Sequence, residues 1–244
     1  MLVKNKVAVV TGGSRGIGEK VAEVLAKEGA NVVVGDLNIV KSDSLTLKTS
    51  MEAGNIYEAY LDITDINNVK DFFKKVMDEF EKIDILVNNA GICKDIKPFE
   101  SMERKDCDVT NEVNIMGTVN CTAEVIPIMK SQKSGRIVNL ASIAGEIGGS
   151  ASSIAYSASK ASIICITKVL AKQLGPEGIT VNSVAPGYII TEMTKTHLHD
   201  LSNVPLRRRG TTLEVANAIL FLSSEMGSYI TGTTIDVNGG VYMN

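Results

Sequence analysis

Two side chains that could move a proton, Tyr156 and Lys160, stand four positions apart in the sequence. On a helix, residues at that spacing lie on one face. A free tyrosine has a pKa of about 10, and a neighbouring ammonium group lowers it by favouring the phenolate. The pair could therefore transfer a proton to or from a carbonyl or alcohol oxygen. Because the same spacing also occurs on ordinary helix faces, its meaning depends on the residues around it.

A third candidate, Ser142, comes just after the apolar segment 137–140. If that segment is a strand of a parallel sheet, Ser142 borders the ligand crevice at the carboxyl end of the strand. Its hydroxyl could then hydrogen-bond a substrate oxygen. The alternative is a serine that only closes a turn.

A glycine-rich turn near the N-terminus could hold phosphate groups. It follows the β-branched segment 7–10 and precedes a helical pattern. At such a junction, backbone N–H groups and the positive end of the helix can bind a pyrophosphate, and glycines allow the close approach. The sequence therefore predicts dinucleotide binding, with contacts from Gly12, Ser14, Arg15, Gly16, Ile17 and Gly18.

Carboxylates after the next two apolar segments could bind the adenosine part of the dinucleotide. Asp36 follows the segment 32–34, where a carboxylate accepts hydrogen bonds from ribose hydroxyls and repels a 2′-phosphate. It favours NAD(H) over NADP(H), whereas Arg15 could pair with a 2′-phosphate and keeps NADP(H) open. Asp62 could bind the adenine amino group, with Leu37 and Ile63 as further contacts beside these acids.

The elements that must position these residues alternate along the chain. Strands are predicted at 7–10, 32–34, 59–61, 83–87, 135–140, 179–184 and 233–237, and helices at 17–26, 69–80, 103–129, 156–174 and 213–222. Strands that are apolar almost throughout are buried on both faces. The pattern therefore predicts an α/β fold, a Rossmann-type doubly wound parallel sheet with helices on both faces, in a single domain over residues 1–244. Residues 186–210 are irregular. Within them, residues 189–209 are the least patterned, which predicts either a binding loop or a variable surface connection.

Composition excludes several other functions. The chain has 25 Lys and Arg against 28 Asp and Glu, and this balance gives no basic surface for a nucleic acid. Its only histidines are His197 and His199, and the cysteines have no metal-ligand spacing, so no metal site is expected and the cysteines are expected to be free thiols. We find no export signal and no apolar run of the roughly 20 residues that span a membrane, which predicts a soluble cytoplasmic protein without a membrane partner.

Together these residues make the sequence similar to the short-chain dehydrogenase/reductase family along essentially its whole length. The motifs are ordered as in that family, and such a set at compatible spacing is highly specific. They are Thr11 to Gly18 for the glycine-rich turn, Asn88-Asn89-Ala90-Gly91, Asn114 within a helix, Ser142, Tyr156 to Lys160, and Pro186-Gly187.

The resemblance implies hydride transfer between a nicotinamide and a carbonyl or secondary alcohol, with the cofactor carrying the hydride chemistry. It implies that Tyr156 is the acid or base, that Lys160 lowers its pKa and binds the nicotinamide ribose, and that Ser142 orients the substrate oxygen. It also implies that Asn114 holds a water in a proton relay. Further cofactor contacts implied by the family are Asn89, Ala90 and Gly91 on the adenosine side, and Pro186, Gly187, Ile189 and Thr191 at the nicotinamide carboxamide.

Within the family, the sequence looks most like bacterial 3-oxoacyl-acyl-carrier-protein reductases, in residues 178–193 and 230–243. Those reductases generally use NADPH and have no acid where Asp36 stands, and the segment after Met193 is shorter here. NAD-dependent dehydrogenases of steroids, sugar alcohols or other small alcohols therefore stay open, as does a non-catalytic dinucleotide-binding regulator. The resemblance implies a small-molecule or acyl-thioester substrate and a homotetramer built partly on the helices that carry Asn114 and Tyr156.

Overall fold

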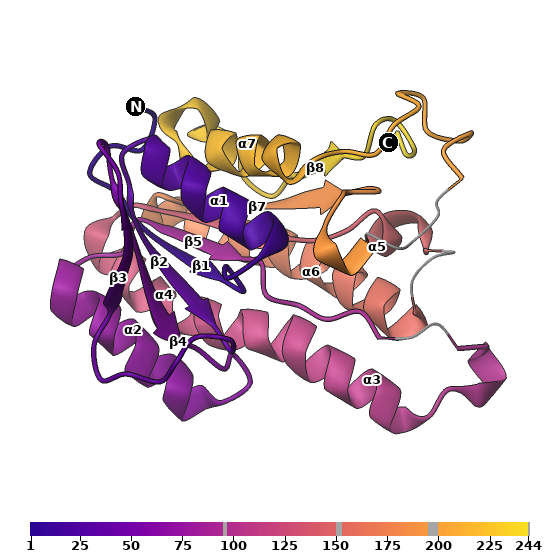
Figure 1. The fold of residues 1–244 in the computed structure, drawn as a ribbon, viewed down its shortest axis with the longest axis horizontal. Helices are drawn as coiled ribbons and strands as arrows, with labels where there is room; N and C mark the ends of the chain where they lie inside the picture. Colours follow the sequence, from indigo (N-terminus) through magenta and orange to yellow (C-terminus); the bar gives the residue numbers. More distant parts are fainter. Residues whose placement is uncertain (95–96, 150–152, 195–199, 244) are drawn as a thin grey trace.

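An eight-stranded sheet forms the centre of the protein (Figure 1). The computed structural model describes residues 1–94, 97–149, 153–194 and 200–243. The strands lie in the order β3-β4-β2-β1-β5-β6-β7-β8, and every pair is parallel except β3 with β4. Their bounds are β1 Val7–Thr11, β2 Asn31–Asp36, β3 Thr46–Ser50, β4 Asn55–Tyr60, β5 Ile85–Asn88, β6 Gly135–Leu140, β7 Ile179–Pro186 and β8 Thr234–Val237.

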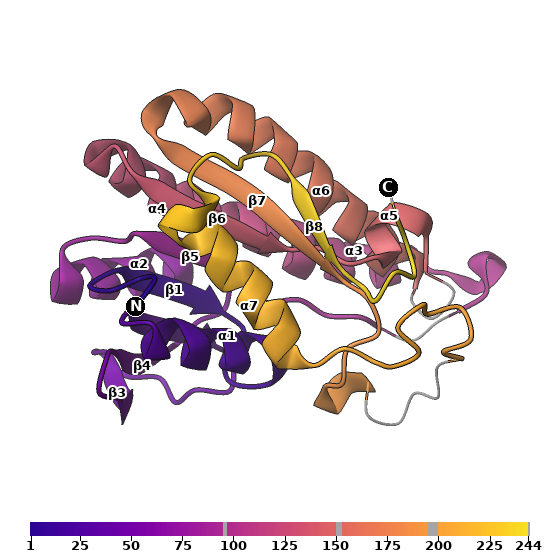
Figure 2. The same ribbon diagram turned by 90° about the horizontal axis from the view of Figure 1, so that it is seen from above.

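Helices cover both faces of the sheet, as the two views in Figures 1 and 2 show. Side chains along a strand alternate between two apolar clusters: Val32 and Val34 pack on one face, and Val33 packs on the other. One face carries α1 (Gly16–Lys27) and α7 (Thr212–Ser223), and the other carries α2 (Ile66–Phe80), α4 (Gly117–Gln132) and α6 (Ile154–Leu174). The predicted doubly wound α/β fold is confirmed.

The stretch predicted as one helix over residues 103–129 is helical but changes its winding. Helix α3 (Arg104–Asn111) leads into a π-helical turn at Glu112–Met116, and α4 follows directly. Such turns are rare and often occur at functional sites. Here the turn contains the buried Asn114.

The strand β3 is a feature that the sequence pattern did not predict. All its residues are exposed, and its side chains are mostly polar, so it has no apolar alternation that would indicate a strand. It is held by antiparallel pairing with β4, the next strand along the chain, and by the ion pair between Lys48 and Glu58. The neighbouring β4 also begins earlier than predicted, at Asn55.

The predicted irregular stretch 186–210 contains some local structure. A parallel bridge joins Ile189 to Gly210, and a short 3-10 turn, η4, covers Glu192–Thr194. The two histidines, His197 and His199, lie outside the described residues.

Helix α6 is apolar over most of its length. In the described part of the chain, residues Ile154–Glu177 form the one helical stretch that length and composition would allow to cross a membrane. The helix packs along β7 and against α5 (Ala144–Ile147), so it belongs to the layer that covers the sheet.

Candidate active site

The glycine-rich turn joins β1 to α1 at the carboxyl edge of the sheet. Gly12 and Gly16 have φ angles of 64° and 65°, which glycine adopts far more readily than other residues. A Cβ at Gly16 would have no atom within 4 Å, so a ligand can approach the backbone there. The first N–H groups of a helix have no helical partner. The turn can therefore present free backbone donors to an anion.

Gly18 and Asn89 hold this turn in shape. A Cβ at Gly18 would lie 2.4 Å from Asn89 Nδ2, so a larger side chain would not fit. Asn89 Nδ2 donates to the carbonyl oxygens of Thr11 and Gly12, at 2.9 and 2.8 Å. The hydroxyl of Thr11 in turn accepts from the N–H groups of Asn89 and Ala90, both at 3.1 Å. Thr11 and Asn89 thus tie the loop after β5 to the turn after β1.

Asp36 ends β2 beside the glycine-rich turn. Its Oδ2 accepts from the Ser14 N–H at 3.1 Å, and its Oδ1 accepts from the N–H and the side-chain amide of Asn38 at 3.0 and 2.9 Å. Burial raises the pKa of this carboxyl, but the hydrogen bonds from Ser14 and Asn38 outweigh burial and lower the pKa below its ordinary value. Asp36 is therefore an anion at neutral pH.

Asp62 lies after β4 in a tight polar turn. Its Oδ1 accepts from the N–H and the hydroxyl of Thr64, at 3.0 and 2.7 Å, and its own N–H donates to Asn68 Oδ1 at 2.6 Å. Both bonds to the carboxylate go to Oδ1. The other oxygen can therefore accept from a ligand amino group.

The proposed proton-transfer residues come together from β6 and α6. Ser153 caps α6 by accepting from the Tyr156 N–H at 3.2 Å, which fixes where the helix begins. Lys160 Nζ lies 5.7 Å from the centroid of the Tyr156 ring and donates to the carbonyl oxygen of Leu140 at 2.5 Å. Ser142 follows the same strand and hydrogen-bonds the Tyr156 phenol.

Burial shifts the pKa values of Tyr156 and Lys160 in opposite directions. Burial raises the pKa of Tyr156 to about 12, although the hydrogen bond with Ser142 opposes the shift. Burial also lowers the pKa of Lys160 to about 8. Both groups are taken out of water, which disfavours the charged form of each, and the effect of Lys160 on the tyrosine pKa stays a prediction. In this structure the phenol therefore keeps its proton at neutral pH.

Asn114 bridges two segments that border the cleft. Its Oδ1 accepts from the Ile92 N–H at 2.8 Å, and its Nδ2 donates to the Ile92 carbonyl at 3.0 Å and to Ser159 Oγ at 2.9 Å. Ser159 also donates to the Tyr156 carbonyl at 2.7 Å. Asn114 thus links the chain after β5 to the first turn of α6, and its role in a proton relay stays a prediction.

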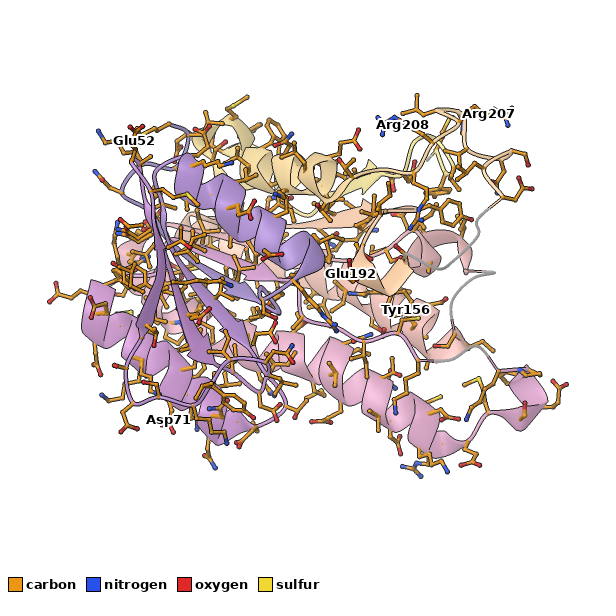
Figure 3. All side chains as sticks on the ribbon, viewed as in Figure 1. Glu52, Asp71, Tyr156, Glu192, Arg207 and Arg208 are labelled. Carbon is orange, nitrogen blue, oxygen red and sulfur yellow. The ribbon has the colours of Figure 1, made fainter. Side chains whose placement is uncertain are left out.

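One cleft of about 470 Å³ connects these parts, and all the predicted site residues line it except Ser14, Gly18 and Asn114. Those three act through the residues that they bind or pack against. Tyr156 and Glu192, both labelled in Figure 3, line the same cleft. Sequence reasoning missed several lining residues, because they lie next to motifs without belonging to them: Asn38, Thr64, Ile92, Cys93 and Val113.

The residues of the cleft fit a dinucleotide. The open space above Gly16 suits phosphates, and the carboxylates of Asp36 and Asp62 suit an adenosine. The buried Lys160 and the half-buried Tyr156 lie at the other end. A Cβ at Gly91 would lie 3.1 Å from Asn114 Oδ1 and 3.6 Å from Lys160 Nζ, so the absence of a side chain there keeps that end open.

Known proteins match the chain over nearly its full length. The family model described as Enoyl-(Acyl carrier protein) reductase matches residues 12–242. A protein named 3-oxoacyl-[acyl-carrier-protein] reductase FabG from Staphylococcus epidermidis is 40% identical over 98% of this chain and 100% of its own length. The protein of the same name from Thermotoga maritima is 40% identical over 99% of each chain.

Solved structures agree with these matches. The crystal structure of a 3-oxoacyl-[acyl-carrier protein] reductase from Brucella melitensis superposes with a TM-score of 0.90 at 31% identity, over 100% of this chain and 93% of that one. The chain belongs to the short-chain dehydrogenase/reductase family. The family resemblance predicted from the motifs is therefore confirmed, and this short-chain dehydrogenase/reductase is an oxidoreductase.

Proposed function

We propose that the protein reduces the keto group of 3-oxoacyl thioesters with a nicotinamide cofactor. The observation that carries the reaction class is the single cleft, because it joins a phosphate-binding turn to Ser142, Tyr156 and Lys160. The substrate class is supported by the names of the full-length relatives. The family model is described by an enoyl reduction, but the full-length relatives are named for the 3-oxoacyl reaction.

When bound, the reduced nicotinamide supplies the hydride. Ser142 hydrogen-bonds the substrate carbonyl oxygen and orients it toward Tyr156. Tyr156 then gives its phenolic proton to that oxygen as negative charge develops on it. The raised pKa suits this direction, because the phenol is protonated before the reaction.

Lys160 contributes a positive charge next to the tyrosine ring, and its ammonium group is a hydrogen-bond donor for the nicotinamide ribose. Its Nζ is held by the Leu140 carbonyl, so the ammonium is already oriented. Asn114 fixes the loop at Ile92 and, through Ser159, the start of α6. We propose that it also holds a water through which the proton of Tyr156 is replaced.

We propose NAD(H) as the preferred cofactor. The Asp36 carboxylate is charged and buried at the end of β2, so a 2′-phosphate placed there would meet an anion. Arg15 argues for NADP(H), because it lines the same cleft, is exposed, and forms no ion pair with any residue that the structure describes. Asp36 is the stronger of the two, since its position is fixed by three hydrogen bonds.

A substrate panel tests the proposal. Acetoacetyl thioesters of coenzyme A and of acyl carrier protein, hydroxysteroids and polyols are assayed with both cofactors. We expect the acetoacetyl thioesters to give the highest kcat/KM, and NADH to be preferred over NADPH. An Asp36→Ala variant should reduce this preference by about tenfold or more, because the charge repulsion is lost. Turnover of only steroids or polyols would favour the alternative, an NAD-dependent dehydrogenase of small alcohols.

We also propose that the protein is a cytoplasmic homotetramer. Exposed apolar side chains lie on the helices that carry Asn114 and Tyr156, on the outer side of the fold: Val109, Met116, Val119, Ile154 and Val169. Contact between copies would cover them, which is favourable for apolar surface.

A further inference from the structure

The guanidinium of Arg209 is surrounded by neutral oxygens. Its Nη2 donates to the Ile189 carbonyl at 3.1 Å, to the Thr194 carbonyl at 3.0 Å and to Thr194 Oγ1 at 2.6 Å. Its Nε is buried and has no partner in the described part of the chain. The Arg209 side chain therefore binds both ends of one short segment, at Ile189 and at Thr194.

That segment, Ile189 to Thr194, forms a wall of the cleft, which we call the β7 wall. Ile189, Thr191, Glu192 and Thr194 all line the cleft. The wall follows β7, which neighbours the strand that leads to Ser142, whereas Asp36 ends β2 on the far side of β1. The β7 wall therefore borders the end of the cleft where the reaction would occur.

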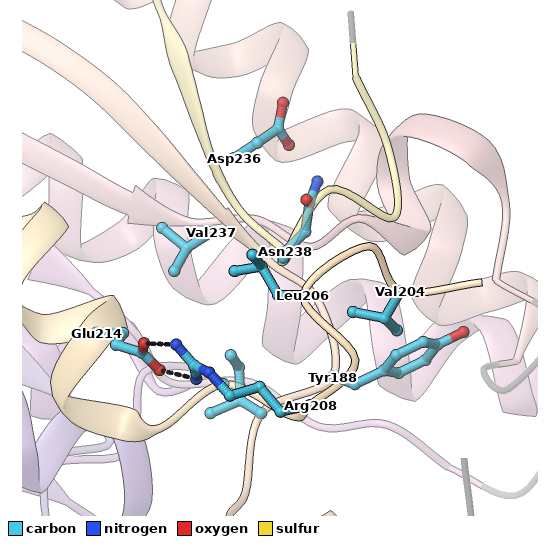
Figure 4. Close-up of a pocket in the computed structure, with 11 residues that line it drawn as sticks. Tyr188, Val204, Leu206, Arg208, Glu214, Asp236, Val237 and Asn238 are labelled. Atoms are coloured by element: carbon cyan, nitrogen blue, oxygen red, sulfur yellow. Dashed lines mark hydrogen bonds and ion pairs between the residues drawn. The ribbon is translucent and has the colours of Figure 1, made fainter. Parts of the chain in front are cut away.

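Apolar packing alone does not support the β7 wall from behind. A separate cavity of about 150 Å³ lies there, and Ile189 lines both this cavity and the cleft (Figure 4). Across the cavity, Arg208 pairs with Glu214 of α7 through two contacts at 2.5 and 3.1 Å. This pair holds the chain next to Arg209 against α7. Because a void has no partner atoms for its lining, the position of the wall depends on polar bonds.

Those bonds form a compact set around Arg209. The Ile190 N–H donates to Gly210 O at 2.9 Å, and the Gly210 N–H donates to Tyr188 O at 2.9 Å. Within the wall, Thr194 Oγ1 donates to Ile189 O and accepts from the Thr191 N–H. Arg209 also joins the first and last residues of the wall, so its removal would leave the end at Thr194 held only by the bonds within the wall.

We propose that Arg209 is a positioning residue that holds the β7 wall against the reactive half of the bound dinucleotide. The inference rests on the proposed function for its effect on catalysis, but the anchoring itself does not. It follows that loss of Arg209 lowers the binding affinity for the whole dinucleotide and slows turnover. Binding of the adenosine half, which Asp36 and the glycine-rich turn hold, is unaffected.

The test compares Arg209→Met with the control Arg136→Met. Arg136 also has a buried Nε without a described partner and donates to a backbone carbonyl, but it lies at the amino end of β6, opposite the cleft. The affinities for NADH and for AMP are measured by calorimetry. We expect Arg209→Met to lower the affinity for NADH about tenfold, as for the loss of hydrogen bonds to a charged group. The affinity for AMP should change less than about twofold. Arg136→Met should change neither.

A second measurement does not depend on activity. Amide hydrogen exchange of peptides covering residues 188–194 should become faster in Arg209→Met and stay unchanged in Arg136→Met. Arg209→Lys, which keeps one charged donor, should restore part of the NADH affinity and of the protection. Unchanged exchange, or equal weakening of NADH and AMP, would overturn the inference. If the native protein bound neither NADH nor AMP, the proposed function would fail, and the exchange result would still decide the role of Arg209.

Discussion

At the scale of single residues, burial determines the properties of the reacting groups more than their mutual charge does. Lys160 has an exposed fraction of only 4%, and Tyr156 is packed beside it. Each keeps the neutral form more readily than in water, so Tyr156 is an acid at neutral pH and Lys160 can lose its charge near pH 8. The proposed reduction of a ketone would use both the phenolic proton and the ammonium charge.

The titration of Lys160 predicts a pH dependence. Below a pKa of about 8 the amine is an ammonium ion, and above it the charge is lost, so kcat/KM for ketone reduction should fall as the pH rises through that region. Tyr156 does not contribute a fall there, since its pKa is about 12. In Lys160→Arg the fall should disappear, because a guanidinium does not titrate in this range. A native profile that stayed flat to pH 10 would contradict this assignment.

At the scale of secondary structure elements, most of the site follows from where parallel strands end. The ends of β1, β2, β4, β5, β6 and β7 meet at one edge, so residues that directly follow apolar segments, such as Asp36 and Ser142, could be predicted to lie together. Asn38 could not, because it reaches the site through the turn after β2 rather than through a strand end. The role of Arg209 could not be predicted either, because its partners lie 15 and 20 positions away, across an irregular loop.

Helix α5 carries Glu146, whose carboxyl interacts with that of Asp236 on β8, and the sequence did not indicate this pair. Burial and the carboxyl of Asp236 on β8 together raise the pKa of Glu146 to about 7, while the Lys168 ammonium acts in the opposite direction. Glu146 Oε2 and Asp236 Oδ1 are both buried without another partner in the described residues. In Figure 4, the Asp236 side chain points away from the small cavity. The two carboxyls can share one proton, which joins α5 to β8.

This pair makes stability depend on pH. The folded protein releases the Glu146 proton near pH 7, and the unfolded chain releases it near its ordinary value of 4.5. The contribution to stability is therefore fully present below about pH 4.5 and is lost as the pH rises through 7. Glu146→Gln should reduce the fall in Tm between pH 5 and pH 8, whereas Glu52→Gln, on an exposed turn, should not. Equal falls in the native protein and in Glu146→Gln would refute the shared proton.

At the scale of the whole molecule, one continuous sheet gathers residues from position 12 to position 194 into one cleft. The complete site needs both halves of the sheet, so we expect residues 1–244 to unfold as a single domain. The apolar helices α4 and α6 leave side chains such as Val119 and Val169 exposed in one copy, at 37% and 48%. Their burial between copies would couple folding to assembly.

Light scattering and thermal unfolding test this expectation together. The native protein should have the mass of four 26.1 kDa chains and unfold in one transition, whose Tm rises with protein concentration. Val169→Glu should dissociate the assembly, because it places charges on the face that is covered, and should leave the circular dichroism spectrum unchanged. A monomeric native protein, or two separate transitions, would contradict this description.

The most direct test of the central claim, that Tyr156 protonates the substrate within this cleft, is the steady-state rate of Tyr156→Phe on an acetoacetyl thioester, with the affinity for NADH measured in parallel. The phenylalanine ring fills the same space but has no proton to give. We expect kcat to fall by about 10²–10⁴-fold, as for the loss of a general acid, while the NADH affinity stays within about twofold. Native turnover in Tyr156→Phe would contradict the account.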